Sequence, residues 1–436
     1  MFINEATRSF IRQHQDEDVR KLALQGTKDA AVDLPMALQQ IAGRQTALKK
    51  LPSWAATEDI VYPPHLNMEQ CSSEQTARYK AKVVQQLVGS EPSDKGRFVD
   101  LTGGFGVDFY WMSQGFQQRN YVEQNDELCA ISSENFHTLG LDCTVLCGSA
   151  AEHLVAMPPA DVIYLDPARR NEHGGRTYSI EDCTPNVLEL LPLLMEKARF
   201  VVIKLSPMLD WRKAVEDIRQ SKDNSQKSIA NVSEVHIISV DNECKELLLV
   251  LCHKQTENIK VVCVNDDTVF LAVPTVGTHS TSRWYDEYQA LVRTVPTIGT
   301  NLVLPSENAS EMASTAFSYL YEPNASIMKA GCFKELEHQF PVLQISDNSH
   351  LFVAANEIDD FPGRKFQITA ISSMNKQELR ITLKDIRQAN ITVRNFPLTV
   401  DQLRKKLKLK DGGNCFIFAT TMADGQHKLL ICRKIG

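Results

Sequence analysis

The chain has 436 residues, of which 43% are hydrophobic and 23% are charged, and at roughly 100 to 200 residues per domain this length predicts two to four folded domains. This composition excludes a disordered or collagen-like chain, and no apolar run reaches the roughly 18 to 20 residues that span a bilayer. The net charge of -7 hides an asymmetry: from Gly363 to Gly436 there are 15 Lys and Arg against 5 Asp and Glu, whereas the preceding residues carry a net charge of -17. The basic end predicts an appended polyanion-binding module, with a merely solvated basic surface as the alternative.

The first residues, MFINEATRSFIRQHQDEDVR, are mixed in charge and lack the apolar core of a secretory signal, so we expect a cytoplasmic protein that uses no membrane. Eleven cysteines are scattered from Cys71 to Cys432 without a CxxC pair, and the histidines lack spacing such as HxxxH. We therefore expect reduced thiols and neither a disulfide framework nor a metal site.

Helical periodicity dominates the start of the chain. Apolar positions at helical spacing over residues 1 to about 50 predict a small helical domain, which we place at 1–75. A loop with three prolines follows it. Ser72 or Ser73 is then predicted to cap a helix that leads into the next domain, at 76–256.

Seven short apolar runs alternate with helical stretches between Arg97 and Lys254. The first five are separated by enough residues for a crossover helix, whereas DNECKE joins the last two as a hairpin would. This pattern predicts an α/β fold with a mostly parallel seven-stranded sheet, in which ligands bind at the carboxyl ends of the strands. The runs are RFVDLT, NYVEQ, CTVLC, DVIYLD, RFVVIKLS, EVHIISV and ELLLVLC.

Turn-rich sequence with strand-like and helix-like stretches fills residues 257–362 and predicts a small α+β domain. The basic residues 363–436 contain the strand-like KFQITAISS, NCFIFATT and KLLICRK around a helix-like LTVDQLRKKLKL. We expect them to form a second α+β domain.

The first strand-like run ends in VDLTGGFGVD, which contains Gly103, Gly104 and Gly106. Glycines let the backbone turn sharply and approach a bound ligand, and the following helix would present free N–H groups. The spacing is not GxGxxG, because Val107 and Asp108 follow Gly106. A tight strand-to-helix turn without a ligand is the alternative.

Two later strand ends add to this site. Glu123 lies about 17 residues after Gly106, near the spacing at which an acidic side chain accepts the two hydroxyls of a ribose. A surface carboxylate at a strand end is the alternative. In CGSA, Ser149 and Ala150 would line an adenine pocket.

The fourth run ends in DVIYLDPARR. At this position Asp166 and the main-chain carbonyl of Pro167 would face the ligand cleft, where both can accept hydrogen bonds from an exocyclic amino group. Arg169 and Arg170 can grip phosphate or stack on a base. A structural Asp with two solvated arginines is the alternative.

The glycine loop, the acid after strand two and the Asp-Pro after strand four resemble class I S-adenosylmethionine (SAM)-dependent methyltransferases across residues 76 to 255. This resemblance implies a Rossmann-like fold with SAM as its cofactor. DPAR matches the place of the D-P-P-aromatic motif of nucleobase amino-methyltransferases, which implies Asp166, Pro167 and Arg169 as catalytic residues. The implied cofactor-binding residues are Asp100, Thr102, Gly103, Gly104, Gly106, Glu123, Ser149 and Ala150.

Within that superfamily the helix SSEQTARYKAKVV and the glycine loop are similar to RNA guanine-N2 methyltransferases, which include trimethylguanosine synthase. The whole chain more closely resembles a bacterial group of methyltransferases that carry a THUMP-like domain, here from about residue 363. YLYEPNASIMKAGCF resembles the ferredoxin-like linker domain of the same group. Since THUMP domains bind structured RNA, the resemblance implies methyl transfer to an exocyclic amino nitrogen of a base, guanine N2 above others, in tRNA or rRNA.

The DPAR motif departs from the family pattern at two positions. Arg169 stands where an aromatic residue would stack on the base, with Tyr178 or Tyr164 as substitutes, and Ala168 replaces the second proline. DPAR is also similar to the D-P-P-R of uridine C5-methyltransferases, which place a cysteine nucleophile just after strand five. Here that place holds Ser206, so an amino nitrogen is the better target.

Two other classes of function stay open. One is a catalytically silent RNA-binding protein on a methyltransferase scaffold. The other is a methyltransferase of a protein or small molecule. At the end of strand five, the sequence indicates that Lys204 makes a phosphate contact or lies on the surface. No interface stripe predicts an oligomeric state.

Overall fold

The computed structural model describes residues 3–89, 96–169, 180–221, 229–254, 258–272 and 317–435. They form two compact units. The first unit contains Met1–Val240 and Lys245–Ile259, and the second contains Asp241–Cys244 and Lys260–Gly436. None of the helices in the described ranges is both long and apolar enough to cross a bilayer.

The first unit begins with six helices, five of them before Ser72, as the periodicity predicts. Their N-termini are closed by polar side chains; Ser73, for example, accepts a hydrogen bond from the Thr76 amide and so caps α6. Trp54 and Tyr62 of this helical part share a core with Phe105 of the glycine loop. The helices are α1 (Glu5–His14), α2 (Val19–Gln25), α3 (Leu34–Lys50), α4 (Pro52–Ala55), α5 (His65–Gln70) and α6 (Glu74–Val88).

Seven strands of the first unit lie side by side in the order β8-β9-β7-β4-β1-β2-β3. Neighbours among β7, β4, β1, β2 and β3 are parallel, whereas β9 runs antiparallel to β7. The mostly parallel arrangement predicted for these seven strands is therefore confirmed. The strands are β1 (Arg97–Asp100), β2 (Gln118–Glu123), β3 (Thr144–Cys147), β4 (Ala160–Leu165), β7 (Ala198–Leu205), β8 (Asn231–Val240) and β9 (Glu243–Cys252).

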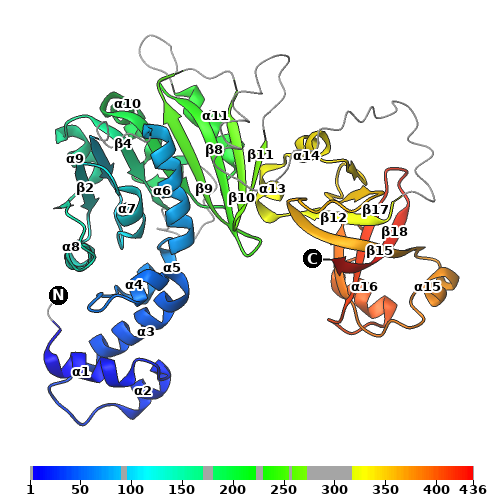
Figure 1. The fold of residues 1–436 in the computed structure, drawn as a ribbon, viewed down its shortest axis with the longest axis horizontal. Coiled ribbons are helices and arrows are strands. Elements are labelled where there is room, and N and C mark those ends of the chain that lie inside the picture. Colours follow the sequence, from blue (N-terminus) through cyan, green and yellow to red (C-terminus); the bar gives the residue numbers. More distant parts are fainter. Residues whose placement is uncertain are drawn as a thin grey trace. The chain divides into compact units, whose positions relative to one another are not determined.

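Helices cover both faces of this sheet, and α6 and α7 cross one of them (Figure 1). Val162 and Tyr164 of β4 share a core with α6, α7 and α8, and the alternate residues Ile163 and Leu165 are equally buried on the other face. The remaining elements are α7 (Val107–Met112), α8 (Asp126–Thr138), α9 (Ala150–Ala156), β5 (Ala168–Arg169), the 3-10 turn η2 (Ile180–Asp182), β6 (Cys183–Thr184), α10 (Val187–Lys197) and α11 (Trp211–Gln220).

The second unit contains the antiparallel pair β10 (Lys260–Asn265) and β11 (Thr268–Ala272) and a seven-stranded sheet in the order β13-β14-β12-β15-β18-β17-β16. In that sheet β12 pairs with β15, so residues before and after Gly363 share one sheet. The other elements are β12 (Tyr319–Pro323), α13 (Ala325–Ala330), α14 (Phe333–Gln339), β13 (Leu343–Gln344), β14 (Phe352–Ala354), β15 (Gly363–Ser373), α15 (Lys376–Thr382), β16 (Asn390–Arg394), α16 (Val400–Leu407), β17 (Cys415–Thr421) and β18 (His427–Ile435).

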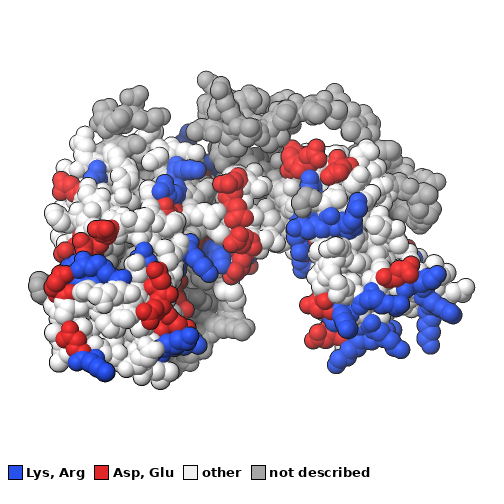
Figure 2. Space-filling view, turned by 60° about the horizontal axis from the view of Figure 1, so that its bottom comes forward, with Lys and Arg blue, Asp and Glu red and all other residues white. Residues whose placement is uncertain are grey.

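Exposed cations gather on the second unit, around α15 and α16. Figure 2 shows this concentration of Lys and Arg on the lower part of the unit at the right. These side chains make no ion pair with any residue that the structure describes, unlike Arg394, which pairs with the buried Glu322 at 2.7 Å. We call them the basic patch: Lys376, Arg380, Lys384, Arg387, Lys405, Lys406, Lys408 and Lys410.

Candidate active site

Three carboxylates meet at the carboxyl edge of the parallel strands, because β1 lies between β2 and β4. Asp100 is the last residue of β1, Glu123 is the last residue of β2, and Asp166 directly follows β4. Thr102 joins two of them: its amide donates to Asp100 Oδ1 at 2.9 Å, and its Oγ1 accepts from the Asp166 amide at 2.6 Å. The structure thus brings together the strand ends that the sequence singles out.

The three glycines of the loop have different reasons to be glycine. A Cβ on Gly103 would lie 2.0 Å from the Tyr121 ring, and one on Gly106, where φ is +80°, would lie 2.5 Å from Phe136. Both are needed for packing. Gly104, where φ is +55°, faces open space, since the nearest atom to an added Cβ is 4.0 Å away. Only at Gly104 is there room for a ligand to approach the backbone.

Glu123 is fixed beside this open position. Its Oε2 accepts from the Gly104 amide at 2.8 Å and its Oε1 accepts from the Asn125 amide at 2.9 Å. The Gly104 carbonyl is held in turn by the hydroxyls of Tyr121 and Ser132. Each carboxylate oxygen keeps a second lone pair for an incoming hydroxyl.

Ser149 and Ala150 lie at the end of the neighbouring strand, in the turn from β3 to α9. The turn is tied to Glu123, whose carbonyl accepts from the Gly148 amide at 2.9 Å. Both residues are half-buried, and Ser149 makes no capping hydrogen bond to α9. An open glycine, a fixed carboxylate and this short polar turn fit the nucleoside part of SAM.

The segment after Asp166 forms a short ribbon. Pro167 is buried, and Ala168 and Arg169 of β5 pair with Thr184 and Cys183 of β6. Arg170 and Tyr178 lie outside the described residues.

Tyr164, the other candidate for stacking on a base, is 1% exposed, and its hydroxyl donates to Asp108 Oδ2 at 2.8 Å. The expectation for Tyr164 is wrong, because β4 turns this side chain into the core beneath α7.

A buried cluster of charges lies under the site, and sequence reasoning missed it. Lys204 Nζ lies 2.5 Å from Asp166 Oδ2 and 3.6 Å from Asp108 Oδ2, and Lys80 Nζ lies 3.0 Å from Asp108 Oδ1 and 2.5 Å from Glu246. Both lysines also donate to Ser72 Oγ, at 3.1 and 2.7 Å. Lys204 is buried rather than on the surface.

The cluster controls how its members ionise. Burial opposes charge on Asp108, but Lys80 and Lys204 hold the pKa of that carboxyl below its usual value. Burial also opposes charge on Lys204, but Asp166 and Asp108 raise its pKa well above the usual range. Both groups are therefore charged at neutral pH.

The pKa of Asp100 is shifted in the opposite direction to that of Asp108. Burial, with the carboxylates of Asp108, Asp166 and Glu123 nearby, raises its pKa well above the usual value, although the Thr102 amide opposes this. A cationic ligand at this edge would therefore stabilise the ionised form of Asp100.

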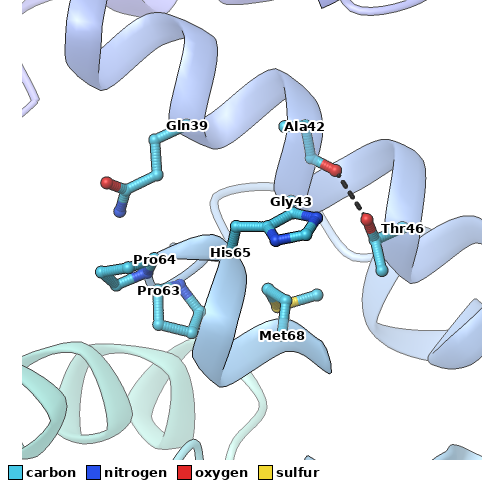
Figure 3. Close-up of a pocket in the computed structure, with 8 residues that line it drawn as sticks. All are labelled: Gln39, Ala42, Gly43, Thr46, Pro63, Pro64, His65 and Met68. Atoms are coloured by element: carbon cyan, nitrogen blue, oxygen red, sulfur yellow. Dashed lines mark hydrogen bonds between the residues drawn. The ribbon is translucent and has the colours of Figure 1, made fainter. Parts of the chain in front are cut away.

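The described residues also line a small cavity of about 190 Å³ in the N-terminal helices (Figure 3). Gly43, Pro63 and Met68 are among its lining residues, and none belongs to the strand-end site. Its Gln39 donates to the Tyr62 carbonyl at 3.0 Å, which ties α3 to the following loop. We assign it no part in the chemistry. In the described part of the chain, no group of three or more His, Cys, Asp and Glu side chains is placed to hold a metal ion.

Two family models match the carboxyl-terminal part of the chain. A model described as THUMP domain-like matches residues 363–434, and a model described as a ferredoxin-like domain matches residues 319–362. No curated protein matches the chain.

Among solved structures, a candidate methyltransferase from Porphyromonas gingivalis W83 is 28% identical, covers 100% of both chains and has a TM-score of 0.77. A candidate class I SAM-dependent methyltransferase from Listeria monocytogenes is 11% identical over 60% of this chain and 93% of its own, with a TM-score of 0.38. Only the first of these likenesses extends over the whole length of both chains. The chain is therefore similar over its whole length to a solved protein described as a candidate methyltransferase, and its residues 319–434 match ferredoxin-like and THUMP-like domain models.

Proposed function

We propose that this protein transfers a methyl group from SAM to an exocyclic amino nitrogen of a base, guanine N2 above others, in structured RNA such as tRNA or rRNA. The observation that carries the proposal is the meeting of Glu123, the open Gly104 and Asp166 at one edge of the sheet, with Thr102 joining the loop to Asp166. One edge can thus hold both a nucleoside cofactor and an acceptor for an amine.

SAM, when bound, supplies a methyl group on a sulfonium, which is already a strong electrophile. The protein then has mainly to bind and orient. Glu123 would accept hydrogen bonds from the ribose hydroxyls, and the turn at Ser149 and Ala150 would border the adenine. Gly104 would allow the close approach of the cofactor to the loop.

Asp166 would orient the acceptor. Its side chain is 36% exposed, and Oδ2 is its nearest atom to Lys204 Nζ, at 2.5 Å. No described residue donates a hydrogen bond to Oδ1, which can accept from an amine N–H. This contact, with the Pro167 carbonyl, would hold the nitrogen lone pair in line with the methyl carbon at about 3 to 3.5 Å. As the N–C bond forms, Asp166 can accept the N–H proton and release it to water.

Recognition of RNA rests on the second unit. The match of residues 363–434 to a THUMP-like model and the eight exposed cations of the basic patch both support a polyanionic partner. Phosphate contacts from this patch would position the RNA, and Arg169 would stack on the base or contact phosphate. The four-domain division, at 1–75, 76–256, 257–362 and 363–436, is part of the proposal.

The test is transfer of labelled methyl from SAM to total RNA, with tRNA and rRNA fractions separated and the nucleosides identified after digestion. We expect label in RNA as N2-methylguanosine with wild type and at least 100-fold less with Asp166→Asn. Label in protein or in a small molecule instead would favour the second class of substrate, and SAM-independent RNA binding without any transfer would favour the silent scaffold.

Deletion of the residues from Gly363 onward would not test RNA recognition, because it would disrupt the sheet of the second unit. Removal of β15 would expose the edge of β12, which pairs with it from Tyr319 to Pro323. Loss of activity would then report misfolding of the second unit. Substitutions in the basic patch avoid this difficulty.

A further inference from the structure

The buried charge cluster is asymmetric in its exposure. Lys80 is fully buried, and Lys204, Asp108 and Glu246 are each 10% exposed or less, whereas Asp166 is 36% exposed. The described cluster contains two lysines against three carboxylates, so one negative charge is uncompensated. Asp166 is the most exposed member of the cluster.

Lys204 is placed to act on that member. It comes from β7, the neighbour of β4, and its Nζ is held by Asp166 at 2.5 Å, by Asp108 at 3.6 Å and by Ser72 Oγ at 3.1 Å. Three partners from three parts of the chain fix the ammonium group. Lys204 therefore has little freedom to follow the Asp166 carboxylate if it rotates. One carboxylate oxygen is thereby engaged and the other is left for a ligand.

We propose that Lys204 is a positioning residue, which holds Asp166 with Oδ1 facing the substrate. This inference rests on the proposed function, because it assigns Asp166 the amine contact. Lys80 and Ser72 support the arrangement from beneath, since Lys80 compensates Asp108 and Ser72 bridges the two lysines.

The charges around Asp166 determine how removal of Lys204 should change its pKa. Asp166 is faced by Lys204 of β7, Asp108 of α7, Lys80 of α6 and Asp100 of β1. Lys204 is the nearest cation, so its loss leaves two carboxylates and a more distant lysine. Burial already raises the pKa of Asp166, and Lys204 opposes this rise. Without Lys204 the pKa must rise further, and the acid limb of the pH–rate profile must move to higher pH, because a protonated Asp166 no longer accepts at the same strength.

The experiment compares wild type, Lys204→Met, Lys204→Arg and the double variant Lys204→Met/Asp166→Asn, with RNA methyl transfer followed from pH 5 to 9. We expect a loss in kcat of about 10- to 100-fold for Lys204→Met, with SAM affinity within about threefold of wild type, and an acid limb shifted up by about one pH unit. Lys204→Arg should restore most of the rate. In the Asp166→Asn background, the Lys204 substitution should have little further effect.

Lys80→Met is the matched control, because it also removes a buried lysine of the cluster but does not touch Asp166. A merely structural role for Lys204 predicts that both lysine variants lose stability alike, with unmoved pH limbs and effects that add to Asp166→Asn. That result would overturn the proposal. Should Lys204→Met fail to bind SAM or fail to fold, the comparison of Lys204→Arg with wild type keeps the pH test.

A readout without substrate separates this inference from the proposed function. The pKa of the Asp166 carboxyl can be followed by NMR of carboxyl-labelled protein, assigned with Asp166→Asn. If wild type transfers no methyl to RNA, the proposed function fails, and a higher Asp166 pKa in Lys204→Met would still support the link between these residues. An unchanged Asp166 pKa contradicts it.

Discussion

Lys204 and Lys405 carry the same charge in opposite settings. Lys204 is buried, and two carboxylates and a hydroxyl fix its position. Lys405 is exposed on α16 and makes no ion pair with a described residue. A buried, paired charge has one geometry and is little affected by salt, whereas an exposed charge adapts to its partner and is screened. The first suits chemistry at a defined atom, and the second suits contact with a flexible polyanion.

The largest effect is expected in the buried charge cluster, at Asp166. Asp166→Asn keeps the shape of the side chain but removes its charge, and we expect kcat to fall by roughly 10²- to 10³-fold, with SAM affinity within about threefold. Steady-state methyl transfer and calorimetry measure the two quantities. Asp161→Asn is the matched control, since Asp161 lies at the other end of β4 and accepts from the Arg97 amide at 2.9 Å. An Asp166 variant as active as this control would remove Asp166 from the mechanism.

Substitutions in the exposed basic patch should affect RNA binding rather than catalysis. Replacing Lys405, Lys406 and Lys410 with Gln is expected to weaken RNA binding by about 10- to 100-fold at low salt and to lower the salt slope by about one unit per lost phosphate contact. Transfer at saturating RNA should be nearly unchanged. Filter binding across salt concentrations measures this.

A matched triple variant controls for net charge. Lys21, Lys49 and Lys82 are exposed lysines of the first unit, and their replacement with Gln removes the same charge outside the patch. Equal losses of RNA affinity in the two triple variants would show that total charge, rather than the patch, governs binding.

The smallest expected effect is on stability. Asp100→Asn removes a buried carboxyl whose pKa is raised, and we expect the free energy of unfolding of the unliganded protein to increase by about 0.5 to 2 kcal/mol near neutral pH. SAM affinity should fall in the same variant. Denaturant unfolding and calorimetry give the two values.

The increase in the free energy of unfolding in Asp100→Asn depends on pH, and the sign of this dependence follows from the raised pKa. Because the folded pKa of Asp100 lies above the unfolded value, wild type loses stability as pH rises from about 4 through the folded pKa, whereas the variant lacks this loss. The gain should therefore be small at pH 4 and larger at pH 7. A gain that is the same at both pH values would contradict the raised pKa.

The sequence predicted the sheet because its strands are continuous apolar runs with acids at their ends. Glu123 and Asp166 could be proposed as site residues for the same reason, since strand ends in a parallel sheet meet at one edge. The role of the N-terminal helices could not be predicted. Trp54 packs against Phe105 of the glycine loop with ring centroids 5.1 Å apart, across about 50 residues of sequence.

The buried charge cluster escaped prediction for a related reason. Lys80, Asp108, Lys204 and Glu246 come from four elements that only the tertiary fold brings together. A signal was present, however. Lys204 interrupts the apolar run VVIKL in the middle of a buried strand, and a charge in such a place needs a buried partner. Tyr164 was misjudged because side-chain direction along β4 depends on register.

The strand edge around Glu123 is the proposed binding site for SAM. Calorimetric titration of wild type, Glu123→Ala and the control Glu127→Ala, whose exposed side chain lies on α8 nearby, tests it most directly. We predict micromolar binding of SAM and of S-adenosylhomocysteine by wild type and the control, and a loss of at least about tenfold for Glu123→Ala, since two charge-assisted hydrogen bonds are removed. No binding by well-folded wild-type protein, or equal binding by all three, would contradict the account.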